Sequence, residues 1–162
     1  MPYTVKTTGM KEVQAMLEGL AEKAPKAAAY GLYEGAGEMQ REMESQAKRI
    51  KTAPFKYAGP GEQRMPSPEE KAAVERGAIG VAKFDKSDDG CDTSVGFSKT
   101  GYAMIAGRRV PIPMIAASIN SGTSFMQRQP FIRKARNAGG KKAAEVMKRN
   151  ITDYLEKNTG GK

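Results

Sequence analysis

One stripe of small and apolar residues most constrains the fold of this chain. Between Ala28 and Ile50 these residues recur in steps of four, four, three, four, four and three: Ala28, Leu32, Ala36, Met39, Met43, Ala47 and Ile50. This spacing places them on one face of an α-helix of about six turns. Acidic residues lie earlier and basic residues later on the opposite face, which suits the helix dipole. We expect a helix this long, with so narrow an apolar edge, to lie across a sheet.

Three glycines interrupt this helix, namely Gly31, Gly35 and Gly37. Each costs about 1 kcal/mol of helix stability relative to alanine. Their spacing is not that of a phosphate-binding loop, and no strand precedes them. We therefore interpret them as points of close packing against a sheet or a neighbouring subunit.

The region before the stripe predicts two further elements. Residues 3–8 alternate enough to form a short strand. The apolar residues that follow have helical spacing and predict a short amphipathic helix: Met10, Val13, Leu17 and Leu20. Pro25 is expected to close this helix or to kink it.

Residues 51–68 form a long segment rich in proline and glycine. Loops of more than about 12–15 residues in a compact domain are usually functional or disordered. This one is either a loop that orders against a partner or a flexible surface insertion. The segment Ser67-Pro68-Glu69-Glu70 then predicts a helix start, with Ser67 as N-cap and a stop at Gly77.

The centre of the chain predicts strands. Ala78–Phe84 and Asp92–Ser98 flank a hairpin-turn sequence at residues 85–90, and Tyr102–Ala106 turns at Gly107 and returns at Arg109-Val110. Residues 112–119 have a short-helical pattern that ends at Asn120-Ser121-Gly122. This order favours an α+β fold in a single domain, 1–162: a long N-terminal helix packed on a small, mainly antiparallel sheet, with a C-terminal amphipathic helix.

The stretch from Ser121 to Ala135 precedes the last helix. Pro130 suits the first turn of a helix, and the large apolar residues Phe131 and Ile132 need a surface that buries them. A second stripe, formed by Ala144, Met147, Ile151 and Leu155, predicts helix over residues 141–157. Residues 158–162 are expected to be a frayed tail.

Charge is unevenly distributed in this basic chain, whose net charge is +9. Residues 1–81 hold 12 basic against 11 acidic residues, whereas residues 82–162 hold 15 against 7. A basic half suggests a nucleic acid or an acidic protein as a neighbour, or only a solvated basic face. The ten methionines fit either core packing or an adaptable contact surface.

The residue types present exclude much of enzyme chemistry. Without histidine, the chain cannot form a Ser-His-Asp triad, a Cys-His pair or a histidine metal site, and its single cysteine rules out an intramolecular disulfide. The acidic cluster Asp85, Asp88, Asp89 and Asp92 fails as a calcium loop, because Gly96 occupies the position that requires a glutamate. We expect no cofactor, no metal and no catalytic activity; a hydrolase using these aspartates is the least supported alternative. No signal peptide or membrane span is evident, so we expect a soluble, cytoplasmic chain.

Several of these features occur in an order that resembles one family. The long helix ends in Lys48-Arg49-Ile50-Lys51-Thr52-Ala53-Pro54, strands and a short helix lead into Ser121-Gly122-Thr123, and Gln129-Pro130-Phe131-Ile132-Arg133-Lys134-Ala135 opens the last helix. This order resembles the tail-completion (head–tail neck) proteins of long-tailed bacteriophages, which include the lambda-type minor tail protein. The chain departs from that family at Asn120-Ser121, where an acidic-aromatic pair is common, and after the Ala-Pro loop.

The resemblance implies a structural virion protein, made in the host cytoplasm and located in the neck region of the tail. It implies a homo-oligomeric ring, expected to be hexameric, in contact with tail terminator or tail tube proteins and with head connector proteins. The basic half would face passing DNA or an acidic partner ring. The expected partner or DNA contacts are Pro54, Pro60, Arg64, Gly122, Thr123, Arg128, Arg133 and Lys134, with Pro130 and Phe131 as the structural anchor. The alternative function is that of a small basic nucleic-acid-binding protein.

Overall fold

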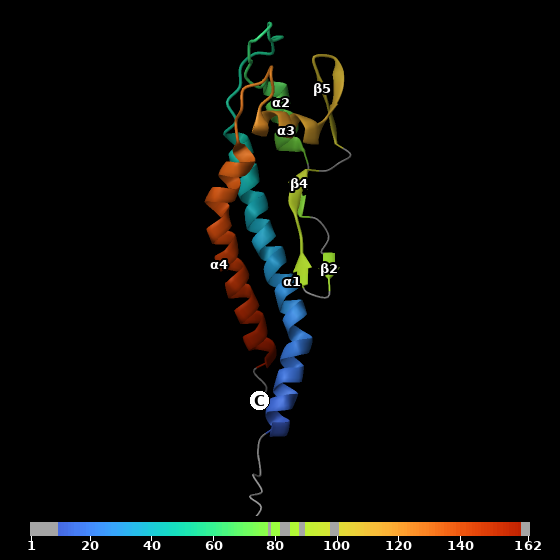
Figure 1. Ribbon diagram of the computed structural model, residues 1–162, viewed down its shortest axis with the longest axis vertical. Helices are drawn as coiled ribbons and strands as arrows, with labels where there is room; N and C mark the ends of the chain where they lie inside the picture. The colour runs from blue at the N-terminus through green and yellow to red at the C-terminus, as the bar shows by residue number, and fades with distance from the viewer. Residues whose placement is uncertain (1–9, 78, 82–84, 88–89, 98–100, 160–162) are drawn as a thin grey trace, which may run out of the picture.

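A computed structural model describes residues 10–77, 79–81, 85–87, 90–97 and 101–159. Two long helices, α1 (Met10–Lys48) and α4 (Phe131–Thr159), run side by side and form an elongated stalk (Figure 1). The remaining helices and one hairpin gather at one end of this stalk, and we call that end the head. The α+β prediction is confirmed, and 62% of the described residues are helical. The strand predicted at residues 3–8 lies outside the described residues.

The first helix is continuous through Pro25, so the prediction of two helices divided at that position is wrong. Pro25 lies on an exposed face of α1, where water can hydrate the carbonyl that loses its hydrogen bond. Near this point the Lys23 ammonium donates a hydrogen bond to the Asn158 carbonyl at the end of α4. Tertiary packing with α4 thus supports helix on both sides of the proline, where local propensity alone predicts a break.

Two glycines of α1 pack against α4 rather than against a sheet. A Cβ atom at Gly31 would lie 2.5 Å from Ile151, and one at Gly35 would lie 2.4 Å from Met147. From the other side, a Cβ at Gly139 would lie 3.1 Å from Glu42. These positions let the two helix backbones approach closely, so α1 packs against α4 as well as against the strands that flank it. At Gly37, by contrast, an added Cβ would meet nothing within 4 Å.

The last helix extends further than its stripe predicted. It begins at Phe131, runs through Gly139 and Gly140, and includes Asn158 and Thr159 of the expected tail; residues 160–162 lie outside the described residues. Ala143 is buried whereas Ala144 is exposed, so the inward face is shifted by one residue from the predicted one at this point. The shift arises because contact with α1 at Gly35 determines which residue faces inward.

An ion pair also joins the two stalk helices. The Lys142 ammonium of α4 lies 3.0 Å from a Glu38 carboxylate oxygen of α1. The hydrogen bond that Glu38 accepts from Lys142, together with the charge of the nearby Arg41 guanidinium, lowers the pKa of Glu38 below its usual value.

Short antiparallel ladders flank α1. β1 (Ile79–Val81) pairs with β4 (Val95–Phe97), and β2 (Asp85–Ser87) pairs with β3 (Gly90–Asp92) in the hairpin between them. The described parts of the two predicted strands thus pair antiparallel as expected, although Asp92 and part of the predicted turn, Asp85–Ser87, pair with each other in the inner hairpin. Residues 78, 82–84 and 98 of the predicted strands lie outside the described residues. Asp88 and Asp89 lie outside the described residues.

The head contains the elements that sequence signals predicted best. They are α2 (Pro68–Arg76), the hairpin of β5 (Tyr102–Ile105) and β6 (Arg108–Pro111), and α3 (Ile112–Ser121). Between β5 and β6, Ala106 and Gly107 both have positive φ, as a tight two-residue hairpin turn requires.

The predicted capping box at the start of α2 is present. The Ser67 hydroxyl accepts a hydrogen bond from the Glu70 amide at 3.2 Å, and the Glu70 carboxylate accepts one from the Ser67 amide at 2.7 Å. Both residues are buried, so this cap is part of the head's interior.

The main core lies where the stalk enters the head. It joins the ends of both stalk helices to α2, α3 and the hairpin, and its buried members include Ile50, Val74, Ile119, Met126 and Phe131. A smaller cluster of Met43, Ile79 and Ala135 continues it down the stalk. The core thus fixes the position of the irregular segments that form the head's surface.

Candidate interaction site

Two irregular segments, 51–67 and 122–130, lie against each other in the head. The Arg64 amide donates to the Phe125 carbonyl at 2.9 Å, and the Gln127 amide donates to the Arg64 carbonyl at 2.9 Å. The Gln129 side chain both donates to and accepts from the Lys51 backbone, at 2.8 Å each. Segment 122–130 therefore docks on the proline-rich segment 51–67 through hydrogen bonds at several positions.

A tight turn at Gly122 and Thr123 directs the second segment. Gly122 has a φ of 75°, and a Cβ there would lie 2.9 Å from the Arg128 Cβ. The Thr123 hydroxyl accepts hydrogen bonds from the amides of Phe125 and Met126, at 3.3 and 3.0 Å. Only glycine combines the backbone conformation of Gly122 with such close contact. Gly122 and Thr123 therefore both stabilise this turn within the chain.

A buried ion pair holds the first segment to α2. The Arg64 guanidinium donates two hydrogen bonds to the Glu70 carboxylate, at 2.6 and 2.7 Å, and stacks over the Phe55 ring at 4.7 Å. Arg64 is only 7% exposed. The bond to Glu70 raises the pKa of Arg64 above its usual value, so the charge is permanent. The pair is one more bond between the irregular segment and the helical part of the head.

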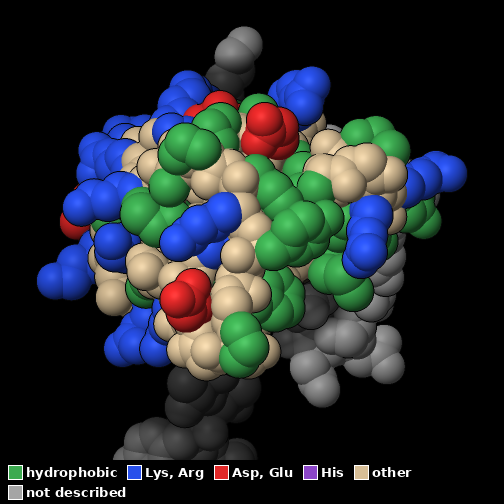
Figure 2. All heavy atoms as spheres, turned by 90° about the horizontal axis from the view of Figure 1, so that it is seen from above, with side chains coloured by type: hydrophobic (Ala, Val, Ile, Leu, Met, Phe, Trp, Pro, Cys, Tyr) green, Lys and Arg blue, Asp and Glu red, His purple; other side chains and the backbone are tan. Residues whose placement is uncertain are grey.

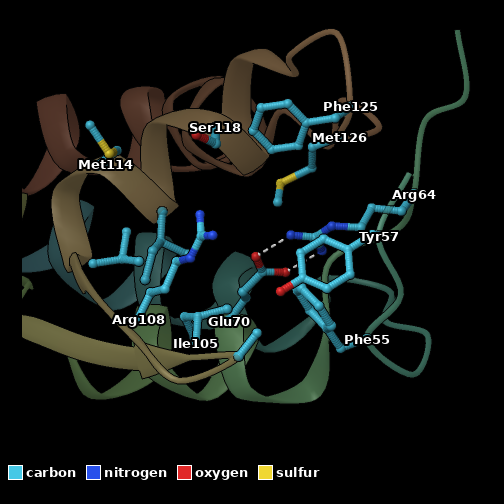
Figure 3. A pocket seen from close by; sticks show the side chains of 13 residues that line it. Phe55, Tyr57, Arg64, Glu70, Ile105, Arg108, Met114, Ser118, Phe125 and Met126 are labelled. Atoms are coloured by element: carbon cyan, nitrogen blue, oxygen red, sulfur yellow. Dashed lines mark hydrogen bonds and ion pairs between the residues drawn. The ribbon is translucent and has the colours of Figure 1, made fainter. Parts of the chain in front are cut away.

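A pocket of about 230 Å³ opens next to this pair (Figure 3). We call it the head pocket. Its walls come from four parts of the head and are mostly apolar: Phe55 and Tyr57 from the first segment, Ile105 and Val110 from the hairpin, Met114 and Ile115 from α3, and Phe125 and Met126 from the second segment. Ser118 and the Arg64–Glu70 pair supply polar groups. Its volume is below the roughly 300–1,000 Å³ of small-molecule sites and suits a single inserted side chain.

One further charged residue, Arg108 of β6, lines the head pocket. Figure 3 shows its guanidinium directed into the pocket, on the side that faces Glu70. Both Glu70 carboxylate oxygens already accept hydrogen bonds from Arg64. Within the part of the chain that the structure describes, the Arg108 guanidinium has no hydrogen bond and no carboxylate partner.

Exposed apolar side chains line the head pocket. Tyr57 is 73% exposed, Phe125 is 48% exposed and Met114 is also exposed. Tyr102 and Met104 are exposed on the other face of the hairpin, because side chains alternate along β5 and Ile105 faces the pocket. Seen from above the head, hydrophobic side chains lie across the centre and to the right with a few Lys and Arg among them, and most Lys and Arg crowd the left side (Figure 2). A contiguous apolar surface on a folded domain typically marks an interaction site.

The structure brings some of the predicted contact residues together at the head. Pro54 and Pro60 are exposed there, on the first segment, whereas Arg64 is buried by its pairing with Glu70. Gly122 and Thr123 are half-buried in the turn described above. These five residues thus lie in one region, but Arg64, Gly122 and Thr123 already make contacts within the chain.

The other predicted contact residues lie at the base of the head. Arg128, Arg133 and Lys134 are all exposed. Phe131 is buried beneath them, and Pro130 immediately precedes α4, where its carbonyl accepts a hydrogen bond from the Lys134 amide at 3.0 Å. The anchor pair therefore sits at the start of the last helix.

Sequence reasoning missed several residues of the head pocket, among them Tyr57, Glu70, Arg108, Met114 and Phe125. Glu70 was recognised only as a capping residue. Phe125 and Tyr57 carried a usable signal, because each is a large aromatic within a polar, irregular segment. Nothing local marks Arg108, which joins the pocket only through the pairing of β5 with β6.

Among the described residues, no group of three or more His, Cys, Asp or Glu side chains is placed to hold a metal ion. No described helix is long and apolar enough to cross a membrane. In comparisons with known proteins, the chain matches no family model, no curated protein and no solved structure.

Proposed function

We propose that this protein is a structural virion protein that forms a homo-oligomeric ring at the head-proximal end of a phage tail and joins the tail to the head. The order of the sequence motifs, from the Ala53-Pro54 loop to the Pro130-Phe131 helix start, supports this identity. Its partners would be other copies of the chain, tail terminator or tail tube proteins, and head connector proteins. The function requires no cofactor.

One structural observation carries the proposal: the apolar surface of the head. Five of the seven large hydrophobic side chains that the structure describes as exposed lie in the head, although the head is only one end of the molecule. Leaving so much apolar surface in water is unfavourable for a monomer and favours burial against another protein. The stalk beneath places this surface at the end of the molecule opposite Met10 and Thr159 (Figure 1).

A specific observation also favours the alternative, a small basic nucleic-acid-binding protein. The basic residues between positions 128 and 149 are all exposed: Arg128, Arg133, Lys134, Arg136, Lys141, Lys142, Lys148 and Arg149. Glu145 is the only acidic residue among them. Lys134, Lys141 and Lys148 are spaced by seven residues, which places them on one face of α4, about 10 Å apart. Phosphates bind such a face without sequence preference.

Purified protein distinguishes the two functions. Electron microscopy and native mass spectrometry should show closed rings for the wild type. The double variant Met114→Asp/Phe125→Asp should remain folded but stay monomeric, because charges in the apolar surface resist burial. The matched variant Lys141→Gln/Lys148→Gln should still form rings.

DNA affinity, measured across salt concentrations, tests the alternative. If DNA binding is the function, the lysine variant should bind more weakly and with a shallower salt dependence, by about 0.9 in slope per lost phosphate contact. Monomeric wild type that binds DNA would contradict the ring proposal. Absence of DNA binding at low salt would remove the alternative.

A further inference from the structure

The head pocket combines two properties that together specify a ligand. Its walls are apolar and its volume of about 230 Å³ suits one large side chain. Its charged groups are two guanidinium cations, Arg64 and Arg108, and one carboxylate, Glu70. Because Glu70 uses both oxygens to bind Arg64, the pocket retains one uncompensated positive charge, on Arg108.

An arginine in this position is suited to bind a carboxylate. Its planar guanidinium donates paired hydrogen bonds that match the geometry of a carboxylate, and it does so more strongly next to apolar walls than in open water. Arg109, the next residue along β6, behaves differently: its guanidinium stacks over the Tyr102 ring at 4.2 Å. The two neighbours thus offer a comparison between an arginine that lines the pocket and one that does not.

We infer that the head pocket receives a segment of a partner protein in which a large apolar side chain lies beside a carboxylate, the side chain filling the apolar cavity and the carboxylate pairing with Arg108. The carboxylate is the C-terminus of the partner chain, because there it stands on the same residue as the apolar side chain and both reach one small pocket. This inference names the partner chemistry of the apolar surface on which the proposed function rests. It requires only that the surface binds protein, whatever the assembly.

A pair of small probes tests this recognition directly. N-acetyl-phenylalanine carries the ring and a carboxylate, whereas N-acetyl-phenylalaninamide carries the same ring without the charge. Each is titrated into the full-length protein while the methyl NMR signals of Ile105, Met114, Ile115 and Met126 are followed. We expect saturable shifts at these methyls. N-acetyl-phenylalanine should bind about tenfold more tightly than N-acetyl-phenylalaninamide, which is the lower end of the free-energy range for a hydrogen bond to a charged group.

Two matched variants identify the arginine. Arg108→Gln should abolish the tenfold preference for the carboxylate over the amide, whereas Arg109→Gln should retain it. Both residues are exposed, so neither variant is expected to unfold the protein. Affinities measured with acetyl-phenylalanine at increasing salt should fall, since the pair is partly exposed.

Several results would overturn the inference: equal binding of the two probes, shifts confined to methyls outside the pocket, or a preference that survives Arg108→Gln. Pocket methyls that shift on dilution of the protein alone would instead assign the pocket to a second copy of this chain. Failure of the protein to form rings or join heads to tails, with the carboxylate preference intact, would remove the proposed function and leave this inference standing.

Discussion

Replacing Phe131 with alanine is expected to lower the free energy of unfolding by about 3–5 kcal/mol, the range for truncating a buried aromatic side chain. Phe131 is 3% exposed and lies in the main core beside Ile50 and Met126. Its ring meets the Phe97 ring edge to face, with 6.3 Å between centroids. The loss combines the transfer free energy of the ring with the cavity that it leaves, because neighbours from different segments of the chain cannot all collapse into the space.

Chemical unfolding followed by far-UV circular dichroism measures this change, since the helix signal is strong and the chain has no tryptophan. Phe125→Ala is the matched control, because that ring is half exposed and should cost less than about 1 kcal/mol. If Phe131→Ala leaves stability almost unchanged while assembly fails, Phe131 is an interface residue and its assignment to the core is wrong.

Replacing Arg64 with methionine is expected to cost about 3–5 kcal/mol, because it leaves the Glu70 carboxylate buried without its counter-charge. The Ser67 amide, at 2.7 Å, would remain as a donor to that carboxylate. Glu70→Met should cost a similar amount, since it leaves the Arg64 guanidinium unpaired and removes half of the capping box. The same unfolding experiment measures both variants.

The double variant Arg64→Met/Glu70→Met distinguishes the cost of leaving one buried charge unpaired from the contribution of side-chain packing. It should lie within about 2 kcal/mol of the wild type, because replacing a buried ion pair by apolar side chains is often neutral, apart from the lost cap. The exposed pair Glu22 and Lys26, with 3.9 Å between charged atoms, is the control, and Glu22→Gln should change stability by less than about 1 kcal/mol. Single-variant costs that simply add in the double variant would show that the two charges do not depend on each other.

The parts of the fold that sequence predicted are those set by local chemistry. Ser67 and Glu70 form the predicted capping box, Gly107 turns the hairpin, and the glycine at 122 ends α3. Each depends on a side-chain or backbone preference that acts over only a few residues. Contacts between distant segments therefore do not change these local structures.

The parts that sequence did not predict depend on contacts between distant segments. Pro25 predicted a helix boundary, but packing along α4 supports the helix through it. Gly31 and Gly35 indicated close packing, yet the partner, α4, lies more than a hundred residues away in the chain. The pairing of Arg64 with Glu70 was missed because no local pattern distinguishes a buried arginine from an exposed one.

The head pocket was unpredictable for the same reason. Its walls come from segments that meet only after the 51–67 and 122–130 segments dock on each other. Charge indicated a basic C-terminal half, and the exposed residues of α4 agree with that. Charge could not indicate that one arginine, Arg108, would line an apolar pocket.

The proposed role in joining heads to tails is tested most directly by deletion of the gene that encodes this chain. Electron microscopy of the lysate should show filled heads and tails that are not joined, and supplying the wild-type protein should restore joined virions. Supplying Met114→Asp/Phe125→Asp should not restore them, although we expect that variant to fold. Normally joined, infectious virions in the absence of the protein would contradict the account.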